Sequence, residues 1–168
     1  RALWEVAASR GGAPVHSSPA FSRDGATVFF GADDARLHAI AAADGAPRWS
    51  VATRAAVQGK PALSARGDAV VVGSWDGSVY CVNASSGAAL WAARTGGKVD
   101  ATARFAPDGR AVYVGSYDGY LYALDAASGA VLWRAPTGGE VRSSATPSAD
   151  GARVFVGSSD GYLYAPLA

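Results

Sequence analysis

The sequence is short of the residues that carry redox chemistry and metal binding. Of its 168 residues, one is a cysteine (Cys81), two are histidines and none is a methionine. A single cysteine excludes an intramolecular disulfide and any zinc site built on cysteines. Because position 1 is not methionine, we expect the chain to be a processed or excised piece of a longer product, and a signal peptide, if one existed, is not there to inspect.

Charge of one sign and long apolar runs are also missing. Fifteen basic side chains against 14 acidic ones leave a formal net charge of +1, which provides no electrostatic footprint for nucleic acid. No apolar run approaches the roughly 20 residues that a membrane-spanning helix needs. The hydrophobic fraction is nevertheless 49%, which is too high for a disordered chain. The composition predicts a folded domain with no nucleic-acid partner and no membrane span.

Repetition is what the sequence has in abundance. A five-residue phrase recurs four times at a constant spacing of 42, with its first glycine at Gly31, Gly73, Gly115 and Gly157. The first repeat carries an insertion of three residues near 11–13. Self-similarity at this period is typical of a propeller or a solenoid. We treat 1–168 as a single domain or segment with approximate repeats 1–42, 43–84, 85–126 and 127–168.

The local pattern within each repeat is that of strands and tight turns. Residues 111–114 and 120–124 are apolar and rich in valine and aromatic side chains, and Asp118-Gly119 lies between them. An Asp-Gly pair between two such runs is a strong hairpin signal. The predicted fold class is all-β, a β-propeller of four 42-residue, four-stranded antiparallel blades. It forms either a closed four-blade ring or half of an eight-bladed ring.

One segment of the repeat carries a family resemblance. Residues 123–133 read Ala-Leu-Asp-Ala-Ala-Ser-Gly-Ala-Val-Leu-Trp, and looser copies occupy 81–91 and 39–49. This resembles the tryptophan-docking motif, Ala-x-Asp-x-x-Thr-Gly-x-x-x-Trp, of the pyrroloquinoline-quinone-like (PQQ-like) repeat family. In that family the tryptophan lies on the outermost strand of a blade and its ring wedges between blades. The resemblance implies structural docking roles for Trp4, Trp49, Trp91 and Trp133.

The same resemblance raises the question of how the ends join. It places Trp4 on an outermost strand, whereas residues 165–168 stand where a docking motif begins. The strand with Trp4 is therefore expected to complete the fourth blade of its own chain or that of a second copy. A closed four-blade ring, a head-to-tail homodimer and further repeats in a parent chain are the alternatives, because the family usually has seven or eight blades.

Some members of the family are quinoprotein dehydrogenases, which hold a quinone and calcium with a vicinal cysteine pair and with Glu, Asn and Asp. Here Cys81 is alone in a column of small strand residues, and Asn83 falls in a turn. We predict no catalytic residue, no metal and no cofactor. Half of a PQQ/calcium-dependent dehydrogenase-like ring, or a sensor or appended domain of a larger receptor or enzyme, is the alternative. Family habit suggests an extracytoplasmic or periplasmic location, and the sequence itself assigns none.

Several eye-catching groups have plain structural explanations. Arg66-Gly67-Asp68 stands where the other repeats have hairpin turns, and Asn83 occupies the turn position of Asp125. His38 occupies a column that is otherwise tyrosine. Four repeat-related aspartates are predicted to bond their own turns rather than a metal; they are Asp34, Asp76, Asp118 and Asp160.

The candidate site comes from positions at which the repeats disagree. The first strand of each blade is predicted to begin at Val15, Val57, Val99 and Val141, and the next residue changes chemistry every time. The middle of the Asp-Gly hairpin phrase also varies, and both positions should lie near the mouth of the central channel. The candidate ligand- or partner-binding residues are His16, Gln58, Asp100, Arg142, Trp75 and Tyr117. They suggest a non-catalytic binding or scaffolding module for a protein or a small ligand. The other interpretation is a set of solvent-facing residues without a ligand.

Overall fold

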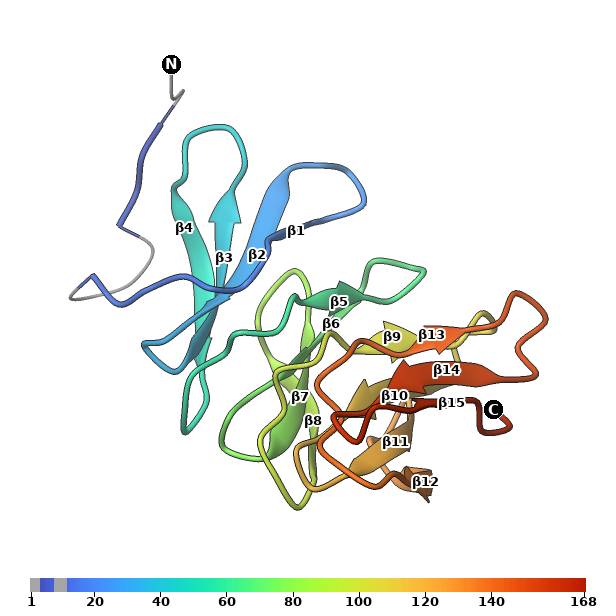
Figure 1. Cartoon of the computed structure of the whole chain (residues 1–168). Coiled ribbons are helices and arrows are strands. Elements are labelled where there is room, and N and C mark those ends of the chain that lie inside the picture. Colours follow the sequence, from blue (N-terminus) through green and yellow to red (C-terminus); the bar gives the residue numbers. More distant parts are fainter. Residues whose placement is uncertain (1–3, 8–11) are drawn as a thin grey trace.

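The structure is a computed structural model, and it describes residues 4–7 and 12–168. Fifteen β-strands occur in this part of the chain, and all of their pairings are antiparallel. They form four successive sheets arranged as the blades of an open arc (Figure 1). Within the same residues, there is no helix with the length and apolar character needed to cross a membrane.

Each sheet keeps its strands in chain order. The first sheet contains β1 (Ala20–Phe21), β2 (Thr27–Ala32), β3 (Arg36–Ala41) and β4 (Pro47–Ala52). The second contains β5 (Ala62–Leu63), β6 (Ala69–Gly73), β7 (Ser78–Asn83) and β8 (Ala89–Arg94). The third contains β9 (Arg104–Phe105), β10 (Ala111–Gly115), β11 (Tyr120–Asp125) and β12 (Val131–Pro136). The fourth has three strands, β13 (Thr146–Pro147), β14 (Val154–Gly157) and β15 (Leu163–Tyr164). The predicted all-β propeller blades are confirmed, and the fourth sheet has no fourth strand among the described residues.

The two central strands of a sheet are apolar on both faces. All six residues of β2 and all five of β10 are buried. Side chains of a strand alternate between the faces of its sheet, so a strand buried throughout must be covered on both sides. Neighbouring sheets cover both faces of β10, whereas β2 packs on the second sheet with one face and on Trp4 with the other. The outermost strand β12 carries only exposed and half-buried residues.

The anchor glycines allow neighbouring sheets to approach closely. A Cβ added to Gly73 would lie 2.3 Å from Val99 Cγ1, and one added to Gly115 would lie 2.4 Å from Val141 Cγ1. Gly31 has the same relation to Val57, at 2.3 Å. The valine of each following repeat therefore occupies the space that any larger residue would need.

The repeated aspartates join turns to neighbouring blades. Asp118 Oδ1 accepts a hydrogen bond from the Tyr120 amide at 3.1 Å, within its own turn. Its Oδ2 accepts from the Tyr122 hydroxyl and from the Gly96 amide of the preceding sheet's connection, both at 2.6 Å. Where the tyrosine is replaced by His38, the ring Nε2 lies 3.0 Å from Asp34 Oδ2. These contacts explain the aspartates without a metal ion.

Arg66-Gly67-Asp68 is a hairpin turn. Gly67 has a φ of 77°, a left-handed conformation that favours glycine. Its amide donates to the Ser64 carbonyl at 2.9 Å, and the Ser64 hydroxyl donates to Asp68 Oδ1 at 2.6 Å. The tripeptide is therefore held in the turn between β5 and β6.

Tryptophans on outermost strands pack on the next sheet and donate a hydrogen bond to it. Trp91 Nε1 donates to the Ala126 carbonyl at 2.9 Å, and its ring packs on Gly129, which has a φ of 73°. Trp49 donates in the same way to the Ala84 carbonyl at 3.1 Å. Trp4 makes the equivalent bond to the Ala42 carbonyl of the first sheet, at 3.1 Å. Residues 4–7 thus lie where the outermost strand of a preceding blade would lie.

Trp133 lies on β12, the outermost strand of the third sheet, and packs against the core between the third and fourth sheets. Its ring centroid is 5.9 Å from that of Tyr113, and it packs against the cluster that contains Val141 and Val154. By analogy with Trp91, which donates to the next sheet, the group that would accept a hydrogen bond from Trp133 falls at the end of the fourth sheet.

The predicted starts of the innermost strands are wrong. β5 begins at Ala62, five residues after Val57, and the other innermost strands are displaced in the same way. The reason is that Val57 donates its amide to the Ala32 carbonyl of the preceding sheet, at 3.1 Å. The Ala56 carbonyl accepts from the Trp75 amide of the following sheet, at 2.9 Å. This stretch is therefore hydrogen-bonded to two hairpins and joins no ladder.

Replacing Trp91 with alanine should lower the free energy of unfolding by about 3–5 kcal/mol, because a buried aromatic ring is lost. Urea denaturation monitored by circular dichroism measures the change. Leu90→Ala is the matched control, since Leu90 is 52% exposed and such surface changes are usually within ~0.5 kcal/mol. Equal effects of the two substitutions would show that the docking contact does not hold the blades together.

Candidate functional site

The candidate residues lie on one face of the arc. In a sheet of alternating strands, the hairpin between the second and third strands lies at the same end as the connection from one sheet to the next. The connections are residues 53–61, 95–103 and 137–145, and a similar stretch precedes β1. We call this surface the connecting face. It comprises the hairpin residues Asp33, Trp75, Tyr117 and Ser159 and the connection residues His16, Gln58, Lys98, Asp100, Glu140 and Arg142.

The backbone of the connecting face is fixed by a repeated hydrogen bond. The Trp75 amide donates to the Ala56 carbonyl, and the Tyr117 amide donates to the Lys98 carbonyl, both at 2.9 Å. The equivalent bond recurs from Asp33 in the first sheet and from Ser159 in the fourth, at 3.0 and 2.9 Å. Each hairpin residue is thereby held beside the connection that leads into its own sheet.

His16 and Gln58 are brought together by a carboxylate. Asp33 Oδ1 accepts a hydrogen bond from Gln58 Nε2 at 2.9 Å. Asp33 Oδ2 lies 3.6 Å from His16 Nε2. The hairpin of the first sheet therefore links the connections on its two sides.

Asp100 and Arg142 are joined in the same way through Tyr117. The Tyr117 hydroxyl donates to Asp100 Oδ2 at 2.5 Å, and the Arg142 guanidinium carbon lies 4.8 Å from the centre of the tyrosine ring. Burial, and then the bond to Asp100, raises the pKa of Tyr117 to about 12. The phenol is therefore protonated at neutral pH and serves as a donor. Arg142 also pairs with Glu140 at 2.5 Å, and this pairing raises the pKa of its guanidinium.

Trp75 forms its own contact between these two groups. The Lys98 ammonium lies 4.2 Å from the centre of the Trp75 ring, within the range of a cation–π interaction. Trp75 Nε1 is buried and has no hydrogen-bond partner among the described residues. The contact of Trp75 is with Lys98 rather than with one of the other five candidates.

Sequence reasoning missed three members of this surface as site residues: Asp33, Lys98 and Glu140. Lys98 and Glu140 stand immediately before Val99 and Val141, where the earlier repeats have proline and alanine. The variation between repeats, which selected the position after the valine, is therefore also present at the position before the valine. Asp33 belongs to the variable hairpin position, and its importance depends on spatial proximity to Gln58 and His16.

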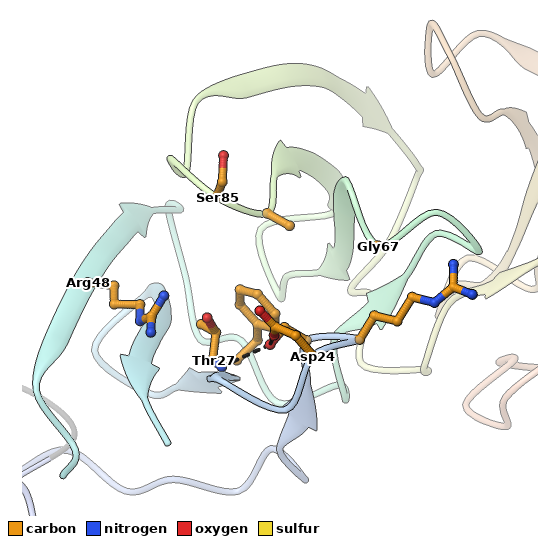
Figure 2. Close-up of a pocket in the computed structure, with 9 residues that line it drawn as sticks. Asp24, Thr27, Arg48, Gly67 and Ser85 are labelled. Atoms are coloured by element: carbon orange, nitrogen blue, oxygen red, sulfur yellow. Dashed lines mark hydrogen bonds between the residues drawn. The ribbon is translucent and has the colours of Figure 1, made fainter. Parts of the chain in front are cut away.

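A hollow of about 440 Å³ lies on the opposite face, between the first and second sheets (Figure 2). Asp24, Thr27, Arg48 and Ser85 contribute to its lining. Arg48 donates to the Ala26 carbonyl at 3.1 Å, and Asp24 accepts from the Ala26 amide at 3.0 Å. A hollow with equivalent lining recurs 42 residues later, between the second and third sheets. It is a repeated consequence of blade packing with polar groups that are already bonded.

The described residues do not fit a quinone and calcium site of the dehydrogenase kind. Cys81 is 1% exposed and lies opposite Trp91 in the β7–β8 ladder. Asn83 Oδ1 accepts hydrogen bonds from the amides of Ser85 and Ser86, at 3.0 and 3.1 Å, in the following turn. Within residues 4–7 and 12–168, no three histidine, cysteine or acidic side chains are grouped so that they could hold a metal ion.

The comparisons with known proteins agree with this architecture. The family model described as outer membrane protein assembly factor BamB matches residues 1–98 and 75–166. The chain therefore belongs to this family of PQQ-like β-propellers. No curated protein matches the chain.

Solved structures show the same fold. The crystal structure of BamB from Moraxella catarrhalis is similar with a TM-score of 0.79 and 25% identity, over 93% of this chain and 47% of that one. The computationally designed Ika4 protein is similar with a TM-score of 0.83 and 19% identity, over 99% and 98%. The designed Ika8 protein gives 0.78 and 20%, over 92% and 46%. The chain thus spans about half the length of the BamB structure that it matches.

Cys81 should be almost inert in the folded protein at pH 8. Burial raises the pKa of its thiol from 9.0 to about 12, and the thiolate is the reactive form. Because the folded state holds the proton more tightly than the unfolded state, this group also lowers stability as the pH rises from 9.0 towards 12. Ellman's reagent measures the reactivity. Ser85→Cys, at an exposed turn position, is the control, and native Cys81 reacting as fast as that introduced thiol would refute the assignment.

Pyrroloquinoline quinone together with Ca²⁺ should leave the melting temperature of the chain unchanged. A ligand at 100 times its Kd would stabilise the folded state by about 2.7 kcal/mol, a shift that differential scanning fluorimetry detects readily. Ca²⁺ alone is the control. Concentration-dependent stabilisation by the quinone would support the alternative of a dehydrogenase-like half ring.

Proposed function

We propose that the chain is a non-catalytic protein-binding module whose binding surface is the connecting face. Membership in a family described as an assembly factor supports a binding or scaffolding role in general. The observation that carries the specific proposal is that the repeats share their buried residues but differ at the neighbouring residues of the connecting face. Val57, Val99 and Val141 are identical in type and fully buried, whereas the residue after each of them is Gln58, Asp100 or Arg142.

The arrangement suits recognition of a protein better than recognition of a small molecule. The Asp33, Trp75 and Tyr117 groups belong to three successive sheets and therefore form a row. They do not surround one hollow. The row alternates carboxylates, cations and aromatic rings, and aromatic residues and arginine dominate the binding energy of many protein interfaces.

The side chains of this row are also held in place before a partner arrives. The Tyr117 hydroxyl is bonded to Asp100, and Arg142 is held by both the Tyr117 ring and Glu140. Ordering a long side chain on binding costs about 0.5–1.5 kcal/mol, and these contacts reduce that cost. The expected partner carries charges of both signs next to apolar groups.

Reversing the cations of the face should abolish partner binding. We expect Lys98→Glu with Arg142→Glu to lower partner recovery at least tenfold, because two favourable cation contacts with the partner become repulsive. Recovery is measured by quantitative mass spectrometry after affinity capture from extracts of cells that naturally produce the protein.

The matched control is Arg66→Glu with Arg110→Glu, on the opposite hairpins, which makes the same change in net charge. A partner retained by the wild type and this control, and lost by the face variant, supports the proposal. Equal recovery by both variants, or no protein recovered by the wild type, contradicts it.

A further inference from the structure

Most charged side chains of the connecting face find their counterpart within the chain. Asp100 Oδ2 accepts a hydrogen bond from the Tyr117 hydroxyl at 2.5 Å. The Arg142 guanidinium pairs with Glu140 at 2.5 Å. Lys98 differs from the other cations of this face, because its side chain is exposed and forms no ion pair with a described carboxylate.

Trp75 is a donor of the same face that lacks an acceptor. Its Nε1 is buried and has no hydrogen-bond partner among the described residues. Tyr117, the equivalent hairpin residue of the next sheet, donates to Asp100 of its own repeat. Gln58 holds the position of Asp100 in the repeat of Trp75, and its amide donates to Asp33 of the preceding hairpin at 2.9 Å. A buried N–H without an acceptor is unfavourable, so an acceptor supplied from outside the chain would be bound favourably.

These two unmatched groups are neighbours. The Lys98 ammonium lies 4.2 Å from the centre of the Trp75 ring, so a cation without a carboxylate stands beside a donor without an acceptor. The carboxylate next to Trp75 in the hairpin is already engaged. Asp76 Oδ2 accepts from the Tyr80 hydroxyl at 2.6 Å and from the Arg54 amide at 3.0 Å. The pair is therefore matched by a group that the chain itself does not supply.

We propose that Lys98 and Trp75 form a carboxylate-binding site that receives an aspartate or glutamate side chain of the protein partner. This proposal rests on the proposed function. One carboxylate oxygen accepts from Trp75 Nε1 and the other accepts from the Lys98 ammonium. A neutral carbonyl would satisfy the indole and leave the ammonium without a counter-charge. Hydrogen bonds to ionised groups are also about twice as strong as those between neutral groups.

The position of the site in the row favours a side chain within the partner over a chain terminus. Trp75 belongs to the second sheet, and the Asp33 and Tyr117 groups belong to the sheets on either side of it. A partner that inserts an internal acidic side chain at Trp75 can continue in both directions along the row and contact all three groups.

Lys98 has to move off the centre of the indole ring for the site to form. Trp75 Nε1 is covered in the free chain, and among the described residues the Lys98 side chain contacts only the Trp75 ring. A cation–π contact at an exposed site is weak, and the lysine stem is flexible. The ammonium can therefore shift to the edge of the ring, where it meets the carboxylate beside the indole N–H.

The test is nuclear magnetic resonance of the five indole N–H groups of the chain. Trp75→Phe identifies the Trp75 signal by its loss. The probe is the peptide acetyl-Ala-Glu-Ala-amide, which carries a single carboxylate, and its neutral counterpart is acetyl-Ala-Gln-Ala-amide. The glutamate peptide should move the Trp75 signal downfield in a saturable manner, because the N–H gains a charged acceptor. The glutamine peptide should leave the signal in place.

Lys98→Gln should weaken binding of the glutamate peptide about tenfold or more, because the counter-charge is lost. Lys60→Gln is the matched control and should leave this binding unchanged. Lys60 is the other lysine of the sequence, is exposed, and makes no cation–π contact among the described residues. An unmoved Trp75 signal, equal movement with both peptides, or undiminished binding by Lys98→Gln would overturn the carboxylate site.

Partner capture with Lys98→Glu and Arg142→Glu separates this site from the proposed function. A partner retained by the wild type and lost by that variant, together with no binding of the glutamate peptide, would contradict the carboxylate site alone. A glutamate peptide that moves the Trp75 signal, together with no protein recovered by the wild type, would contradict the proposed function alone.

Discussion

The structure depends on one constraint: the central strands of the blades are apolar on both faces, so each of these faces must be covered by packing against another part of the chain. The close approach of Gly73 to Val99 satisfies this constraint near the inner strands, and the docking of Trp91 on Gly129 satisfies it at the outer strands. Both contacts need a glycine, since a Cβ would collide with valine or indole. The constraint explains why the same few residues recur at a period of 42.

The connecting face is a consequence of the same packing. Each connection is hydrogen-bonded on both sides, to the hairpin before it and the hairpin after it, as with Val57 and Ala56. The valine supplies the buried contact, and its neighbours in the chain are left to point away from the core. Those side chains do not pack in the core between the blades, so they differ between repeats while their spacing stays constant. A row of different groups on a rigid backbone is suited to recognition, whereas nothing in the described row has the geometry of a metal or quinone site.

Much of this was accessible from the sequence, and the failures have a common origin. The Asp-Gly hairpins and the bonds of the aspartates within their own turns involve residues close in the chain, and the 42-residue period aligns Cys81 with the alanines of its column, so the sequence patterns predicted them. The strand starts were wrong because the amide of Val57 bonds to the preceding sheet instead of entering a ladder. Asp33 and Lys98 were missed as site residues because their roles come from contacts with residues distant in the chain, such as that of Asp33 with Gln58, 25 residues apart. The selected face residues do lie on one surface, and partner binding by them is our proposal.

The sequence by itself determined the number of repeats, their strands and the turns between them. These features depend on local backbone preferences and on a strict period, and both can be read along the chain. Only the tertiary structure decided which side chains of the connecting face meet and that Trp4 docks on the first sheet. The physical reason is that these outcomes depend on the spacing and angle between successive sheets. The curvature that results from stacking four blades sets where the two ends lie, and no single repeat specifies it.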